Sequence, residues 1–235
     1  MRRGGLAVES EKRCVVAIDG PSGTGKSTVS RHLATALGAH YLDTGAMYRA
    51  VTWAVLDAGA DPRDAAVVAD ICTKIKLTSG IDPRSPHISV DGRSVDVEIR
   101  AADVTAAVSA VAAVPAVRAA LVARQREIIQ AAGRIVVEGR DIGAVVAPDA
   151  DLKVFLTASE AERARRRGTE LRGADVSAAD LAATRADLAR RDLLDSTRTA
   201  DPFRQADGAI VVDTTGVAID EVVAHLVQLV PVAVR

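Results

Sequence analysis

The sequence predicts an α/β fold built on a parallel sheet, and two observations support this prediction. Short apolar runs of strand length occur at residues 13–19, 40–42, 134–143, 151–159 and 208–216. Some, such as the first, are apolar almost throughout, which is typical of strands buried on both faces of a parallel sheet. Stretches with helical character lie between these runs, and alternating strands and helices indicate crossover connections.

The composition limits the class of protein. The chain has 235 residues, of which 49% are hydrophobic, enough for one compact domain with a sizeable core. The net charge of −1 lacks the basic excess of nucleic-acid-binding proteins, so we expect no nucleic-acid partner. Residues 1–13 hold no apolar run long enough for a signal sequence or membrane span, and we expect a flexible tail. Cys14 and Cys72 have no metal-type spacing, which predicts a reducing cytoplasm without disulfides or zinc.

Two helices are predicted in the first part of the chain. After the first strand, apolar residues such as Val29 and Leu33 repeat every four positions. Residues 44–59 also have a helical pattern, with Trp53 and Leu56 among the expected core positions.

The pattern changes at 75–97, where short alternating segments are separated by turn residues, including a DG pair. This indicates a small antiparallel insertion on the rim of the main sheet. The sequence at 100–133 predicts two helices that are separated at Pro115. Proline suits the first turn of the second helix. A long polar helix is expected at 177–198, and a last helix at 218–230.

Residues 20–28, GPSGTGKST, follow the first predicted strand and match the phosphate-binding pattern G-x-x-x-x-G-K-[ST]. Glycines let backbone N–H groups curl around phosphate oxygens, and the following helix adds the positive end of its dipole. We expect Lys26 to contact the β- and γ-phosphates of ATP and Ser27 to ligate Mg²⁺. The predicted ATP-binding residues are Gly20, Pro21, Ser22, Gly23, Thr24, Gly25, Lys26, Ser27 and Thr28.

Other features narrow the class of nucleotide-binding protein. The chain contains no asparagine, so it lacks the N-K-x-D motif with which GTPases recognise guanine. In the strand-like run IVVEGRD a single acid, Glu138, is followed by Gly139, Arg140 and Asp141, unlike the DE pair typical of motor ATPases. A hydrolase gains little from an arginine there, whereas a kinase could use it to hold an anionic acceptor.

The stretch HYLDTGAMYRA at 40–50 supplies a second arginine near the phosphate-binding loop. In open α/β sheets, ligands bind at the carboxyl ends of the strands where the strand order switches. Arg49 and Arg140 both follow predicted strand ends, and arginine binds phosphate bidentately better than lysine does. We therefore expect these two arginines to hold the phosphate of a nucleoside monophosphate.

Two arginine-rich helical segments leave alternatives open. Arg191, Asp195 and Arg198 lie at i, i+4 and i+7 and so share one helix face. Such ladders are often solvated ion pairs of little value, and these residues alone do not exclude that reading. The segment 162–167, ERARRR, is either a solvated helix face or part of a mobile lid. Three further polar residues are interpreted as structural: Asp19, Asp43 and Tyr48.

Four separated motifs together resemble the bacterial cytidylate kinase family of nucleoside monophosphate kinases. They are IDGPSGTGKST, YLDTGAMYR, EGRDIG with the following PDADLKVFL, and RRDLLDSTR. The likeness extends from about residue 14 to residue 230 and implies a five-stranded parallel sheet with helices on both faces, a small antiparallel insertion and a mobile lid. The implied parts are a core at 14–43, 134–160 and 205–230, an acceptor-binding subdomain at 44–133, a lid at 163–177, a helix at 178–198 and a tail at 1–13.

The resemblance also implies roles for residues that match the family's motifs. Arg49 and Arg140 match arginines that hold the acceptor phosphate. Ser109, Arg118 and Asp141 match residues that read cytosine.

On the sugar side, Thr44, Arg191 and Asp195 match positions around the ribose. Arg198 matches an arginine near the transferred phosphate, and Arg166 matches a lid arginine on the donor side. Lys26, Arg140, Arg166 and Arg198 are therefore the expected catalytic residues.

Two positions depart from the family's pattern. Thr44 stands where serine is common, which keeps the hydroxyl and adds a methyl group near the ribose. Glu138 stands where aspartate is familiar, so its part in holding the water shell of magnesium is open.

The expected reaction is ATP + CMP → ADP + CDP, with dCMP as a second substrate and Mg²⁺ as cofactor. The attacking phosphate oxygen is already ionised, so no general base is needed. Alternatives are a kinase for UMP, AMP or a non-nucleotide acid, and an ATPase or regulator that uses no acceptor. We expect a soluble monomer in the cytoplasm without a membrane partner.

Overall fold

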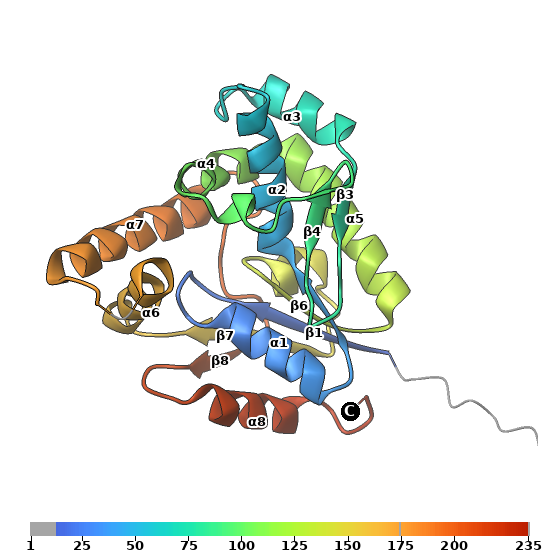
Figure 1. Cartoon of the computed structure of the whole chain (residues 1–235). Helices are drawn as coiled ribbons and strands as arrows, with labels where there is room; N and C mark the ends of the chain where they lie inside the picture. Colours follow the sequence, from blue (N-terminus) through green and yellow to red (C-terminus); the bar gives the residue numbers. More distant parts are fainter. Residues whose placement is uncertain (1–12, 174, 235) are drawn as a thin grey trace, which may run out of the picture.

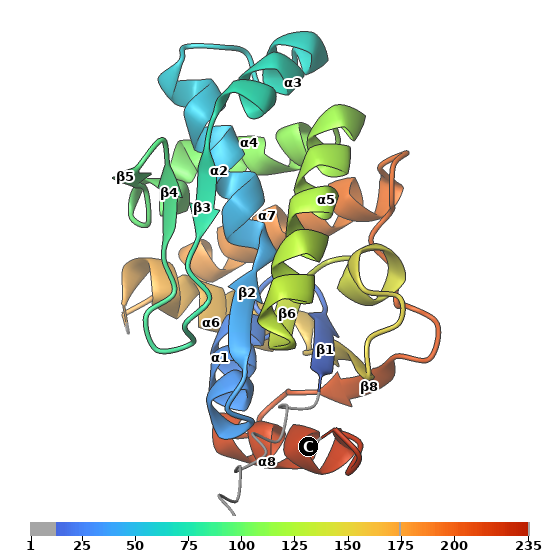
Figure 2. The ribbon, with the colours of Figure 1, turned by 90° about the vertical axis from the view of Figure 1, so that its right-hand side faces the viewer.

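The computed structural model describes residues 13–173 and 175–234, which form a sheet with helices on both faces (Figures 1 and 2). The sheet has five strands in the order β2-β6-β1-β7-β8, and all neighbours are parallel. The strands are β1 (Cys14–Asp19), β2 (His40–Asp43), β6 (Arg134–Gly139), β7 (Leu152–Thr157) and β8 (Ile210–Asp213). The predicted five-stranded parallel sheet is confirmed.

The central strand β1 explains why the first apolar run is continuous. All six of its residues are buried, because it pairs with β6 on one side and β7 on the other. Val15 and Ala17 enter one apolar layer, and Val16 and Ile18 enter the other. From β1 the chain crosses to β2 in one direction, and β7 and β8 lie in the other. The strand order therefore switches at the end of β1, where ligands of open sheets bind.

Helices cover the two faces as separate layers. α1 (Lys26–Ala36) and α8 (Ile219–Leu229) pack together on one face, whereas α2 (Thr44–Asp57) and α5 (Pro115–Ala132) lie on the other (Figure 1). The loop that enters α1 therefore lies between the two layers. Trp53 is half-buried against the second layer.

The antiparallel insertion is confirmed as a three-stranded sheet. Its strands are β3 (Leu77–Ser79), β4 (Ile88–Val90) and β5 (Arg93–Ser94). The DG pair forms the β4–β5 turn, with Asp91 at φ 51° and Gly92 at φ 83°, as expected for a hairpin that requires positive φ.

The rest of this half of the molecule is helical. α3 (Ala65–Lys74) is absent from the predicted elements, and the side chain of Asp64 caps it by accepting from two backbone N–H groups. A short 3-10 turn η1 (Glu98–Arg100) leads into α4 (Ala102–Ala112). Pro115 begins α5, so the predicted break between the two helices is correct.

Two further helices flank the carboxyl ends of the strands. α6 (Glu160–Arg172) begins after the cap Ser159, and α7 (Ala178–Thr197) begins after the cap Ser177. The expected lid at 163–177 thus consists largely of the second part of α6, and its mobility stays a prediction. A π-helical turn η2 (Ile142–Val146) follows β6.

Among the described residues, no single helix has the length and apolar character to cross a membrane. Helices α4 and α5 meet those criteria only when they are combined across a bend of 96°.

Candidate functional site

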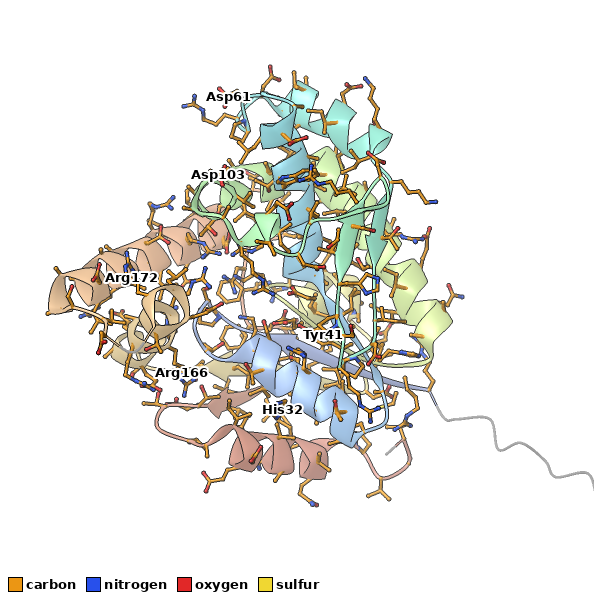
Figure 3. All side chains as sticks on the ribbon, viewed as in Figure 1. His32, Tyr41, Asp61, Asp103, Arg166 and Arg172 are labelled. Carbon is orange, nitrogen blue, oxygen red and sulfur yellow. The ribbon has the colours of Figure 1, made fainter. Side chains whose placement is uncertain are left out.

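A cleft of about 1000 Å³ opens at the carboxyl ends of the strands, where the strand order switches. Its walls come from the loop before α1, the first turns of α2, the end of β6 and the inward faces of α6 and α7. Figure 3 shows Tyr41 near the middle of the molecule and Arg166 on the α6 side, and both line this cleft.

The phosphate-binding loop needs glycine for steric reasons. A Cβ atom on Gly20 would lie 2.2 Å from the backbone oxygen of Leu156, which no side chain tolerates. Gly25 has φ 86° and ends the loop directly before the first residue of α1. The loop therefore brings the N-terminus of α1 to the cleft, where its dipole favours an anion.

Cationic side chains surround this loop and donate to its carbonyl groups. They are Lys26 (2.8 Å), Arg140 (2.7 Å), Arg163 (3.3 Å) and Arg166 (3.1 Å). Because these carbonyl dipoles are satisfied from several elements, the loop is held in its curled conformation with positive charge around it. Burial lowers the pKa of Lys26 below its usual value, and Arg140 adds to this shift.

The end of β6 places a carboxylate beside the same loop. Glu138 is buried, accepts a hydrogen bond from the Tyr41 hydroxyl and also interacts with the Ser27 side chain. Burial raises the pKa of Glu138, and the nearby charge of Asp43 raises it further. Oxygen atoms suited to a hard divalent cation thus lie at the start of α1.

Three arginines converge on the acceptor side of the loop. Arg49 from α2 donates to the Thr105 hydroxyl at 3.0 Å and to a backbone carbonyl at 3.3 Å. Burial, together with the charges of Arg191 and Arg140, lowers its pKa to about 10. The Nε and Nη1 atoms of Arg191 are buried without a hydrogen-bond partner among the described residues. Unpaired buried donors next to like charges are costly, and an anion would satisfy them.

A second cluster lies deeper, between α5 and the end of α7. Arg118 and Arg198 both donate through Nη2 to Asp141, the second of them at 3.1 Å. Arg118 also donates from Nε to Asp201 at 2.8 Å and lies 5.7 Å above the ring centre of Tyr48. This pocket combines donors with an acceptor carboxylate, which is the requirement for reading a nucleobase edge.

The ladder on α7 belongs to the cleft and is not a solvated face. Arg191 and Asp195 are buried, and the side chain of Arg198 is only 6% exposed. Asp195 accepts from Arg140 at 3.0 Å and from the Ser109 hydroxyl at 3.3 Å. The alternative that these residues form surface ion pairs is therefore wrong.

The arginine-rich segment of α6 borders the cleft, and whether it is part of a mobile lid stays a prediction. Arg165 and Arg166 both line the cleft. Arg166 donates to Thr214 after β8, and Arg165 pairs with Glu162 although its side chain is largely exposed. Thr44 also faces the cleft, although its hydroxyl donates to the backbone carbonyl of Glu138 at 2.7 Å. Its contact with a sugar stays a prediction.

The three residues interpreted as structural have identifiable partners. Asp43 caps α2, and Tyr48 packs beneath Arg118. Asp19 accepts from the backbone N–H groups of Ile142 and Gly143, both at 2.8 Å, and burial raises its pKa to about 6. It thereby ties the end of β1 to the loop that carries Arg140 and Asp141.

Several residues that pair with the arginines of the site were not singled out from the sequence. Thr105 orients Arg49, Asp192 pairs with Arg163, and Asp201 holds Arg118. Residues 216–219, after β8, line the donor side of the cleft beside Arg166. The glycine-containing turn after the last strand was the available signal for this loop, because loops after parallel strands meet at one edge of the sheet.

A phosphate-binding loop that shares one cleft with buried arginines and with the polar Arg118–Asp141 cluster is the arrangement of a nucleoside monophosphate kinase. Comparison with known proteins identifies the kind of kinase. The sequence profile of cytidylate kinase matches residues 16–232, so the chain belongs to the cytidylate kinase family.

Curated relatives support the same assignment over nearly the whole chain. The cytidylate kinase of Rhodococcus opacus (strain B4) is 53% identical over 221 residues, covering 94% of this chain and 96% of the relative. That of Nocardia farcinica is 55% identical over 217 residues, covering 92% and 93% respectively. That of Streptomyces avermitilis is 50% identical over 217 residues, covering 92% of each chain.

Proposed function

We propose that this chain transfers the γ-phosphoryl group of ATP to CMP, and to dCMP as a second substrate. The observation that carries the proposal is the convergence of Arg49, Arg140 and Arg191 between the phosphate-binding loop and the Arg118–Asp141 pocket. An acceptor with a phosphate at one end and a polar base at the other fits this order. Its phosphate would lie in line with the ATP phosphates bound by residues 20–28.

The acceptor phosphate satisfies the unpaired donors of the arginine pocket. Arg140 already bridges the two halves of the site, because Nη1 reaches the carbonyl of Gly20 and Nε reaches Asp195. With Arg49 and Arg191 it would hold the acceptor phosphate and neutralise charge that spreads during transfer. Arg198, Arg166 and Lys26 would stabilise the transferred group from the other sides.

The base pocket suits cytosine. Asp141 can accept from the N4 amino group, while Arg118 can donate to the N3 and O2 acceptors. Uracil presents a carbonyl where cytosine presents the amino group, and a carboxylate facing that carbonyl is unfavourable. Ser109 would complete this edge, and Thr44, Arg191 and Asp195 would surround the sugar.

The site also fits Mg²⁺ carried with ATP. The described residues contain no group of three or more His, Cys, Asp or Glu side chains that could hold a metal by themselves. Magnesium bound mainly by nucleotide phosphates requires only one or two protein oxygens, and Ser27 with Glu138 supplies them. The ion would offset charge on the β- and γ-phosphates when bound.

Phosphoryl transfer here needs positioning and no general base. The acceptor oxygen is ionised at neutral pH, so the protein must align it and exclude water. The docking of α6 on the phosphate-binding loop through Arg163 and Arg166 supports a lid role for this helix. A cytoplasmic location, a monomeric state and the absence of a nucleic-acid partner stay predictions.

A coupled assay of ADP release tests the proposal. The purified chain is assayed with ATP and Mg²⁺ against CMP, dCMP, UMP, AMP and GMP, with a reaction lacking any acceptor. Turnover is expected with CMP and dCMP well above the others. Equal ADP release without acceptor would instead identify an ATPase, and a preference for UMP or AMP would assign a different acceptor.

A further inference from the structure

We propose that Asp201, in the segment that follows α7, is a positioning and specificity-determining residue of the acceptor site. The inference rests on the proposed function, because Asp201 contacts the residues assigned above to the base and the transferred phosphate. None of the motifs that identify the family includes Asp201, and the only signal in the sequence is an acidic residue before a proline.

Asp201 binds two arginines of the site through two different groups. Its carboxylate accepts from Nε of Arg118 at 2.8 Å, and its backbone carbonyl accepts from Nε of Arg198 at 2.7 Å. Both arginines then reach Asp141 through Nη2. Asp201 thus holds each guanidinium group by its inner nitrogen and leaves the outer nitrogens directed at Asp141.

The orientation of Arg118 depends on this bond. The side chain is only 3% exposed, and its Cζ atom lies over the Tyr48 ring, 5.7 Å from the ring centre. With Nε held by Asp201 and Nη2 by Asp141, the planar group cannot rotate. Its remaining atom, Nη1, is buried without a partner in the described part of the chain. We expect Nη1 to donate to an acceptor atom of the bound base.

The charge of Asp201 also affects Asp141. Arg118, Arg198, Asp141 and Asp201 form a cluster of two positive and two negative groups. Without the Asp201 carboxylate, two arginines would share the single carboxylate of Asp141. Asp141 would then be a weaker acceptor for an amino group, and the excess positive charge would favour a carbonyl. Removing the charge should therefore shift the preference from cytosine toward uracil.

The backbone at residue 201 allows a clean test. Asp201 has φ 47°, in the left-handed region that asparagine and glycine tolerate well. Asp201→Asn and Asp201→Gly therefore keep the turn, and with it the bond from Arg198, while both remove the carboxylate. Asp207→Asn is the matched control, because Asp207 lies nearby in sequence, is 98% exposed and carries the same charge.

The experiment measures KM and kcat of each variant with CMP, UMP and ATP. Both Asp201 variants should raise KM for CMP about tenfold and lower the CMP-to-UMP ratio of kcat/KM by a similar factor, since the bond from Arg118 becomes one to a neutral acceptor in Asp201→Asn and is absent in Asp201→Gly. KM for ATP should stay within twofold, and Asp207→Asn should match the wild type. In an Arg118→Lys background, which lacks the Nε donor, Asp201→Asn should have little further effect on the ratio.

Two results overturn the inference. One is a CMP-to-UMP ratio within twofold of the wild type in both Asp201 variants, and the other is an equal loss in Asp201→Asn with and without Arg118. A wild-type chain that does not phosphorylate CMP would refute the proposed function itself, and the substrate panel reports that failure separately.

Discussion

The donor and acceptor sides of the cleft are built in different ways. On the donor side one contiguous stretch, residues 20–28, forms the site largely from backbone groups and the dipole of α1. On the acceptor side the groups are side chains from α2, α5, α7 and the loop after β6, brought together across the sequence. The first kind of site needs glycines in one place, whereas the second needs partners for every arginine.

This difference predicts which side of the cleft selects the acceptor. Backbone N–H groups bind any polyphosphate of the right shape, so the donor loop supplies affinity and alignment without choosing an acceptor. Under the proposed function, the acceptor side would choose its substrate through pairs such as Arg118 and Asp141, whose atoms would match one base and oppose another. Variants on the donor side should therefore reduce turnover for all acceptors, whereas variants in the Arg118–Asp141 part of the acceptor side should change the order of preference.

The largest expected effect is on the donor side. Lys26→Met should lower kcat about 1000-fold for every acceptor, because one preorganised charge next to the transferred group is lost. KM for CMP should change little, because the acceptor side is unchanged. Steady-state kinetics with CMP and UMP measure both effects. A loss confined to CMP would contradict the division between the two sides.

The second prediction concerns Asp19, which joins the two sides. Its pKa is about 6 in the folded state against an ordinary value of 3.8, so between these values the folded state holds a proton that the unfolded state has lost. Stability should therefore fall as pH rises from about 4 to 6 and level off above, by up to about 3 kcal/mol.

Asp19→Asn removes this titration and serves as the reference. Urea unfolding of both proteins between pH 4 and 8 gives the difference in unfolding free energy at each pH. Subtraction cancels the contribution of Glu138, whose pKa is also raised. A difference that stays constant across this range would show that Asp19 titrates normally.

The donor and acceptor sides of the cleft also differ in how much of each could be predicted from the sequence. The sheet and the phosphate-binding loop were predictable, because their signals are continuous apolar runs and a local glycine pattern. Arg49 and Arg140 were predictable from their positions after strands. The α7 ladder was ambiguous, since sequence spacing does not report burial.

Other residues gave no usable signal of their role. Asp201 acts on Arg118, which is 83 positions away in the chain, and Asp19 acts on N–H groups more than 120 positions away. Such pairs form only when the fold brings distant loops together. In the sequence, a single aspartate of a turn cannot be distinguished from a single aspartate of a binding site. α3 was not singled out, although Asp64 directly before it is a residue type that caps helices.

The smallest expected effect comes from a variant that keeps the charge of Arg49 and changes the shape of its side chain. Arg49 is fixed by two donated bonds, to Thr105 and to a backbone carbonyl, which leave its other nitrogens available to phosphate. Arg49→Lys keeps the charge but cannot make these bonds and a bidentate phosphate contact together. KM for CMP and UMP should rise about tenfold alike, because one charge-assisted bond is lost and the base pocket is intact.

KM for ATP should stay unchanged, and Arg124→Lys, an exposed change on α5, is the matched control. Arg49 and Arg118 belong to separate hydrogen-bond networks, so the CMP-to-UMP ratio should not change in Arg49→Lys. A changed ratio would show that the phosphate and base pockets are coupled.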